Sequence, residues 1–165
     1  MFREMRRYKQ ALSLLECADI LNKATSGTLA VMGDDNYPYA VPLSFVYDHN
    51  RLIFHCATSG HKIDAIEKNP KVSFCVIAQD QVVEEKYTTY FKSVIVFGKA
   101  HIARNVKEKK EAFEVLAAKY SPRDEKGRMD EMNKLFEQTN IIIVDIEDIS
   151  GKEAIELKKN CEKWL

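Results

Sequence analysis

The sequence predicts a mainly β fold, an antiparallel sheet or small barrel with peripheral helices. About six segments have the length and apolar content of β-strands. Helical patterns occur before, among and after them without regular alternation, which argues against a doubly wound parallel sheet. No internal repeat, low-complexity tract or linker interrupts the chain, so residues 1–165 are expected to form a single domain.

The N-terminal part predicts a helix, a strand and a turn. Ser13 and Glu16 have the spacing of a capping box, and the apolar stripe that follows predicts a helix to about Lys23. Residues 28–32 are typical of a strand, and residues 33–36 are typical of the turn that ends it.

The strand that begins at Tyr37 contains two prolines, Pro38 and Pro42. Neither can donate a hydrogen bond to a ladder, so this strand is expected at an edge, a bulge or an opening of the sheet. After the turn at residues 48–50, residues 51–56 predict another strand.

The middle of the chain predicts a short helix between strands. The loop at residues 57–62 opens this helix, which should end at Asn69-Pro70. Strands are predicted at residues 71–78 and 87–103, whereas the polar residues 79–86 between them allow no firm assignment.

The C-terminal part predicts two helices and a final strand. Residues 106–120 show helical spacing, residues 121–127 are typical of a loop, and the apolar positions of residues 129–136 suggest a second helix. Residues 141–146 predict a strand, and Ser150-Gly151 is interpreted as a turn that leads into a charged tail.

Composition excludes several classes of partner. Lys plus Arg and Asp plus Glu both number 25, so no global field attracts nucleic acid or an anionic membrane. No apolar run approaches the roughly 20 residues that a membrane span requires, and the charged N-terminus lacks the apolar core of a signal peptide. A cytoplasmic protein without nucleic-acid or membrane partners is expected.

The cysteines do not predict a metal site. Cys17, Cys56, Cys75 and Cys161 are scattered, with no Cys-x-x-Cys pair. A set made of His55, Cys56, His61 and Cys75 matches no zinc spacing, so no metal is expected.

The segment Thr58-Ser59-Gly60-His61-Lys62 is a candidate phosphate-binding site. A helix start leaves amides free and favours an anion, while His61 and Lys62 add cations. An ordinary helix N-cap followed by surface residues fits the same pattern and is the commoner occurrence.

His55 interrupts the apolar run Leu52 to Cys56 just before that loop. A hydrogen-bonded, half-buried histidine is the usual outcome at such a position, and a ligand or an acid is the alternative. No dinucleotide-binding, Walker, zinc-protease or serine-hydrolase motif occurs, so any chemistry is expected to come from a bound cofactor.

These segments together resemble the FMN-binding split-barrel superfamily of pyridoxamine 5′-phosphate oxidases, most closely its nitroimidazole-resistance branch. The segments that carry the resemblance occur in family order along nearly the whole chain: residues 33–47, 52–57, 60–62, 69–72, 90–100 and 151–154. The segment after Gly151 lacks an Arg-x-His motif for pyridoxal binding, which argues against oxidation of pyridoxamine phosphate.

The resemblance implies a split β-barrel homodimer that binds two FMN molecules at the subunit interface. The strand from Tyr39 would line the flavin ring with its backbone, His55 and Cys56 would flank the cofactor, and His61-Lys62 would bind the phosphate. His61-Lys62 stands where an arginine is common in the oxidases. The implied cofactor-binding residues are Tyr39, Ala40, Val41, Pro42, Leu43, Ser44, His55, Cys56, Ser59, His61, Lys62 and Ser93.

The function that follows from the resemblance is that of an FMN-dependent oxidoreductase. A nicotinamide nucleotide or another donor would reduce the flavin, and a small acceptor such as a nitroaromatic would receive the electrons, with His55 as the candidate catalytic residue. The alternatives are a flavin- or heme-binding carrier or sensor without turnover, and a ligand-free barrel dimer. The aromatic residues Tyr87, Tyr90, Phe91 and Trp164 would pack either on the partner subunit or in the core.

Overall fold

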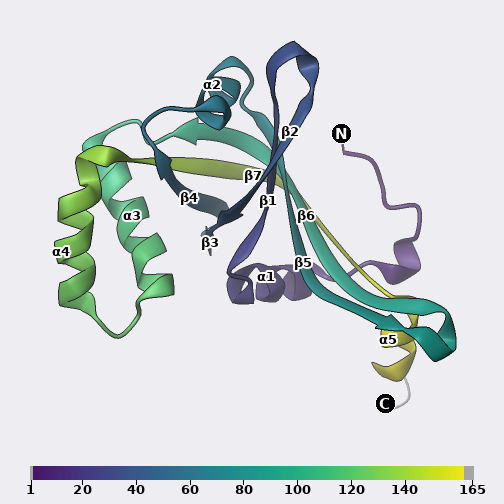
Figure 1. The fold of residues 1–165 in the computed structure, drawn as a ribbon. Helices are drawn as coiled ribbons and strands as arrows, with labels where there is room; N and C mark the ends of the chain where they lie inside the picture. Colours follow the sequence, from purple (N-terminus) through teal and green to yellow (C-terminus); the bar gives the residue numbers. More distant parts are fainter. Residues whose placement is uncertain (1, 162–165) are drawn as a thin grey trace.

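A computed structural model describes residues 2–161, with side chains to residue 158, so Trp164 lies outside the described part of the chain. These residues form one seven-stranded sheet in which every pairing is antiparallel (Figure 1). The spatial order is β2-β1-β5-β6-β7-β4-β3. The strands are β1 (Ser26–Met32), β2 (Pro38–Ser44), β3 (Val46–Asp48), β4 (Arg51–Ala57), β5 (Lys71–Val83), β6 (Thr88–Ile102) and β7 (Thr139–Glu153).

The two edges of this sheet are β2 and β3, which are neighbours in the sequence. Only Phe45 separates them, so the chain passes directly from one edge of the sheet to the other. The sheet must therefore curl until its edges approach each other, yet β2 and β3 do not pair. The result is the predicted split barrel.

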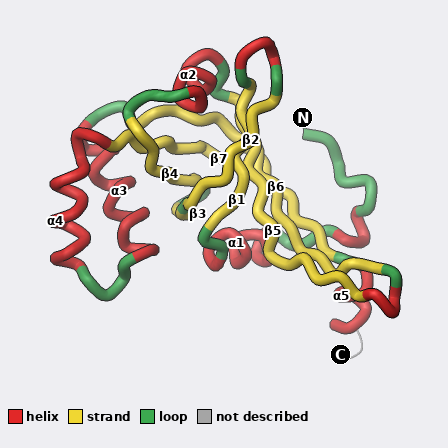
Figure 2. Tube along the Cα trace, in the orientation of Figure 1, coloured by secondary structure: helices red, strands yellow, loops and turns green. Residues whose placement is uncertain are grey.

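In the described part of the chain, five α-helices lie around the sheet (Figure 2). In Figure 1, α3 and α4 form an antiparallel hairpin on one side of the molecule, α2 lies near the end of β4, and the far ends of β5 and β6 reach away from the body beside α5. The helices are α1 (Leu14–Lys23), α2 (His61–Lys68), α3 (Val106–Tyr120), α4 (Glu125–Leu135) and α5 (Ile155–Cys161). None of the helices within residues 2–161 has the length and apolar run needed to cross a bilayer.

The main core fills the inside of the curled sheet. Phe45, Phe54 and Phe74 are fully buried, and Phe74 meets the other two rings edge to face, with centroids 4.7 Å from Phe45 and 5.1 Å from Phe54. A smaller cluster on the other side of β4 and β7 includes Ile53 and Leu116, and it fixes α3 against the sheet.

The end of α3 is also held by polar contacts. The hydroxyl of Tyr120 accepts a hydrogen bond from the Phe45 amide at 2.9 Å and lies within bonding distance of the Thr25 and Phe45 carbonyl oxygens. Lys119 donates to the carbonyl of Ala24, and burial lowers the pKa of this lysine. The helical hairpin is therefore attached where the two edges of the sheet meet.

Several sequence predictions are confirmed. Ser13 and Glu16 form the predicted capping box at the start of α1, and α1 ends at Lys23. The proline-containing strand β2 is an edge strand, as its two missing N–H groups require.

Four predictions about the elements are corrected within the described residues 2–161. There are seven strands rather than about six, and β5 continues to Val83 because its unassigned polar part pairs with β6. The predicted loop at residues 121–127 is shorter, because α4 begins at Glu125. The predicted turn at Ser150-Gly151 is wrong, because both residues lie in β7 and pair with β6. Glycine is needed there for close packing, since a Cβ on Gly151 would collide with the sulfur of Cys17 in α1.

Candidate functional site

The start of α2 presents unpaired backbone amides. Gly60 is the N-cap residue, and no side chain caps the helix, so neither Thr58 nor Ser59 acts as an ordinary N-cap. The first amides, those of His61 and Lys62, have no acceptor within the helix. A Cβ on Gly60 would meet no atom within 4 Å, so open space borders the residue from which the helix starts. This arrangement suits an anion.

His61 is held by residues from two other segments. Its ring stacks on Tyr39 of β2, with centroids 4.3 Å apart and planes 14° apart. Its Nε2 atom lies 3.6 Å from the carboxylate of Asp34, which also bonds to Lys68 at 3.1 Å. The hydrogen bond from Lys68 is the main reason that the pKa of Asp34 is lowered. Gly33 leaves room for this stack, because a Cβ there would lie 3.0 Å from His61 Nε2.

Lys62 lies close to Cys56 at the end of β4. Burial raises the pKa of the Cys56 thiol, and the Lys62 ammonium offsets part of that rise. The Lys62 side chain is half-buried. Tyr39 of β2, Cys56 of β4, and His61 and Lys62 of α2 therefore lie around the helix start.

The free edge of β2 offers backbone hydrogen-bonding groups. Its ladder with β1 runs without interruption, so Pro38 and Pro42 must occupy positions whose nitrogen faces away from β1. Alternate residues share that orientation, so the amides of Ala40 and Ser44 face the unpaired edge. The side chains of Val41 and Leu43 instead point toward the main core.

Pro42 and Ser93 lie on the outer face of the sheet. Pro42 lines a hollow of about 470 Å³ together with Cys75 and Ile77. Ser93 of β6 pairs directly with Ile77 and so shares that face. The same face exposes the side chains of Ile77, Ile95 and Phe97 to 69%, 40% and 38%. It is a mostly apolar surface.

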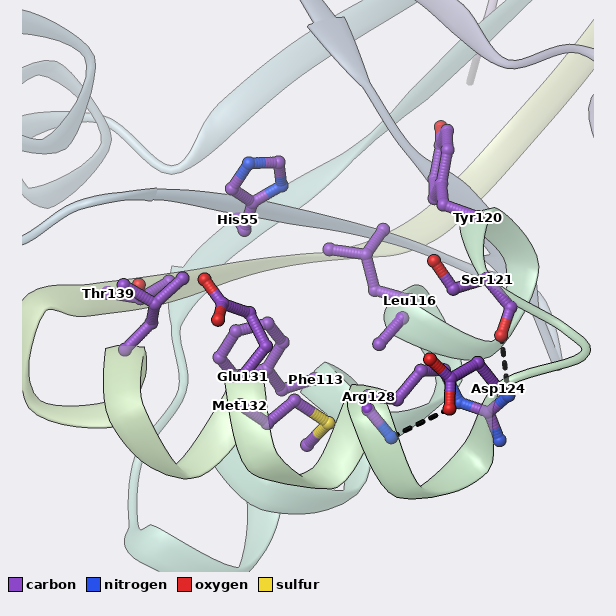
Figure 3. Close-up of a pocket in the computed structure, with 13 residues that line it drawn as sticks. His55, Phe113, Leu116, Tyr120, Ser121, Asp124, Arg128, Glu131, Met132 and Thr139 are labelled. Carbon is purple, nitrogen blue, oxygen red and sulfur yellow. Dashed lines mark hydrogen bonds between the residues drawn. The ribbon is translucent and has the colours of Figure 1, made fainter.

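His55 points away from the other predicted site residues. Successive residues of β4 alternate, so Cys56 faces the main core whereas the exposed His55 side chain faces the α3–α4 hairpin. Figure 3 shows His55 above a pocket whose far wall is formed by α3 and α4. This pocket has a volume of about 390 Å³.

The pocket has an apolar floor and polar walls. Leu116 and Met132 are buried beneath it, and Phe113 lies beside them. Two hydrogen bonds already engage polar groups of the lining: Arg128 donates to the Ser121 carbonyl at 2.6 Å, and Asp124 accepts from the Gly127 amide at 2.8 Å (Figure 3). The lining residues are His55, Phe113, Leu116, Ala117, Tyr120, Ser121, Asp124, Gly127, Arg128, Glu131, Met132, Leu135 and Thr139.

The structure thus spreads the predicted residues over the start of α2, the free edge and inner face of β2, the outer face of the sheet, and the His55 pocket. Within this chain, His55 and Cys56 do not line one cavity, and no three histidine, cysteine or acidic side chains among the described side chains of residues 2–158 gather as metal ligands. Sequence reasoning missed the α3–α4 residues of the pocket. The Asp124-x-x-Gly127 cap was the one available signal, and it indicates a helix start rather than a binding wall.

Comparisons with known proteins agree with the fold. A family model described as pyridoxamine 5′-phosphate oxidase matches residues 13–153. An uncharacterized protein of Rhizobium meliloti is 33% identical over 93 residues, which are 56% of this chain and 56% of that protein. The chain therefore matches about half the length of this curated relative.

Two solved structures are similar over most of the chain. A candidate 5-nitroimidazole antibiotic resistance protein of Bacteroides thetaiotaomicron has a TM-score of 0.75 at 20% identity, covering 87% of this chain and 86% of that one. An FAD-binding protein of Mesorhizobium loti has a TM-score of 0.66 at 30% identity, covering 88% of this chain and 97% of that one.

Proposed function

Because the chain belongs to the pyridoxamine 5′-phosphate oxidase family, we propose that it is an FMN-binding oxidoreductase that passes electrons from a nicotinamide or other donor to a small acceptor such as a nitroaromatic. The observation that carries the proposal is the uncapped start of α2, where free amides, His61 and Lys62 surround open space. The M. loti protein, which is described as FAD-binding, supports a flavin.

The residues present fit a flavin phosphate and ring. The amides of His61 and Lys62 would donate to the phosphate, and the Lys62 ammonium would supply a charge-assisted contact. The amides of Ala40 and Ser44 at the free edge of β2 face outward, where they can donate to the oxygens of a flat heterocycle. When bound, the flavin supplies electron transfer between donor and acceptor.

His55 is the proposed catalytic residue. It stands at the wall of a pocket with an apolar floor, directly before the loop that leads to the phosphate site. An acceptor in that pocket would place its polar group beside the imidazole, which can donate a proton as the acceptor gains electrons.

The absorbance spectrum of the freshly purified protein tests the cofactor. We expect flavin absorbance bands at roughly one flavin per chain, and FMN rather than FAD after release and chromatography. A Soret band would replace the flavin proposal with a heme-binding one. Bound flavin without turnover with any nicotinamide donor and nitro acceptor would favour a carrier or sensor.

We further propose that the protein is a homodimer. The outer face exposes Ile77, Ile95 and Phe97, and the same face carries Pro42 and Ser93, two of the candidate cofactor-binding residues. A second copy would cover this apolar surface and bring the separate site residues of two protomers together. Light scattering at micromolar concentration should give the mass of a dimer. A compact monomer with flavin bound would contradict this proposal.

A further inference from the structure

The His55 pocket differs from the phosphate site in its charge. Two carboxylates, Asp124 and Glu131, face one guanidinium, that of Arg128. The guanidinium is bound to the Ser121 carbonyl at 2.6 Å, and Asp124 is occupied in part by the Gly127 amide. Among the described side chains, Glu131 is paired only with Lys134, at 3.6 Å, and Lys134 is not part of the lining. The pocket therefore has an excess of negative charge when His55 is neutral.

The shape of the pocket suits a small aromatic ring. Its volume of about 390 Å³ lies near the lower end of the range for small-molecule sites, which is roughly 300 to 1,000 Å³. Phe113 and Leu116 offer flat apolar contact, and the thioether of Met132 is a favourable neighbour for an aromatic ring. Figure 3 shows Glu131 on the wall nearest to Thr139, below His55.

We propose that this pocket binds the electron acceptor and selects neutral or cationic aromatic molecules against anionic ones, with Glu131 as the specificity-determining residue. The assignment rests on the proposed oxidoreductase function. It goes further in naming the place of the acceptor and its chemical class. An anionic ring would bring a second negative charge toward Glu131 and Asp124, whereas a cationic ring would be attracted by the same groups.

Three probes of nearly equal size separate charge from shape: benzamidine, benzamide and benzoate. None is reduced by a flavin, so their binding to the flavin-loaded protein can be measured by calorimetry or ligand-observed NMR without turnover. We expect benzamidine and benzamide to bind and benzoate to bind about tenfold more weakly than benzamidine, a modest factor because Glu131 is more than half exposed. Benzoate binding as tightly as benzamidine, or no binding of any probe, would overturn the proposal.

Matched variants locate the effect. Glu131→Gln should reduce the ratio between the benzamidine and benzoate affinities about three- to tenfold. Glu137→Gln changes an exposed residue outside the lining and should leave this affinity ratio unchanged. Equal effects of the two variants would overturn the role of Glu131.

A second pair of variants tests the place itself. Ala117→Leu adds bulk inside the pocket and should abolish binding of all three probes, whereas Ala118→Leu, at the next and exposed position of α3, should not. If the probes bound both variants equally well, their binding site would lie outside this pocket. Failure of this proposal would appear as a loss of probe binding or of charge selectivity. Failure of the proposed function would appear as absent flavin or absent turnover in the wild-type protein, so the two failures can be told apart.

Discussion

Replacing Lys62 with alanine is expected to weaken FMN binding roughly ten- to hundredfold while riboflavin binding changes little. A charge-assisted contact to a phosphate is worth about 1.5 to 3 kcal/mol. Riboflavin has the same ring but no phosphate, so it cannot lose that contact. Lys62 lies in the first turn of α2, beside amides that have no acceptor within the helix. Fluorescence titration of both flavins into the flavin-free protein measures the two affinities.

The matched control for this experiment is Lys68→Ala. Lys68 lies in the last turn of the same helix and pairs with Asp34 rather than facing the open space at Gly60. Its removal changes the net charge by the same amount, so a general electrostatic effect would weaken FMN binding equally in both variants. If Lys62→Ala weakened the binding of FMN and riboflavin equally, the phosphate would not bind at the start of α2.

The variant His55→Phe should retain bound flavin and lower nitroaromatic reduction about a hundredfold. Reduction of a nitro group to a nitroso group consumes two electrons and two protons and releases water, so a proton donor beside the acceptor lowers the barrier. General acid assistance is typically worth a hundredfold or more. His55 is exposed at the wall of the pocket, so a phenyl ring can replace the imidazole without disturbing the main core. Steady-state rates with the flavin-loaded variant provide the measurement.

Two further variants separate proton donation from packing. His55→Gln keeps a hydrogen-bonding side chain but cannot act as a general acid near neutral pH, so it should be as slow as His55→Phe. His49→Asn, in the exposed turn between β3 and β4, should be as fast as the wild-type protein. If His55→Phe turned over at the wild-type rate, His55 would have no part in the reaction, whereas flavin binding would be unaffected.

The sequence predicted the elements well where local signals agree with the tertiary structure. The capping box of α1 appears where Ser13 and Glu16 require it, and the prolines of β2 correctly indicated an edge strand. The turn predicted at Ser150-Gly151 was wrong because glycine occurs both in turns and where two segments of the chain pack closely. A turn and a close approach give the same sequence signal, and here Gly151 makes room for Cys17 inside a long strand.

The candidate site was only partly predictable for a related reason. The neighbours of His61, namely Tyr39 and Asp34, come from the hairpin of β1 and β2, and their contact depends on how the sheet curls. The wall of the His55 pocket comes from α4, whose residues are far away in the sequence and show a weak helical pattern. Spacing within the sequence cannot specify contacts that depend on tertiary packing.

The open sheet also has a consequence for self-association into aggregates. A split barrel has two free strand edges, and exposed edges are templates on which other chains can add strands. The edge at β2 lacks the N–H groups of Pro38 and Pro42 along its unpaired side, and the edge at β3 is only three residues long. An incoming strand would find a broken row of backbone hydrogen-bonding groups at β2 and too few such groups at β3. The opening that could admit a flat ligand to backbone groups therefore resists uncontrolled strand addition even when no ligand covers it.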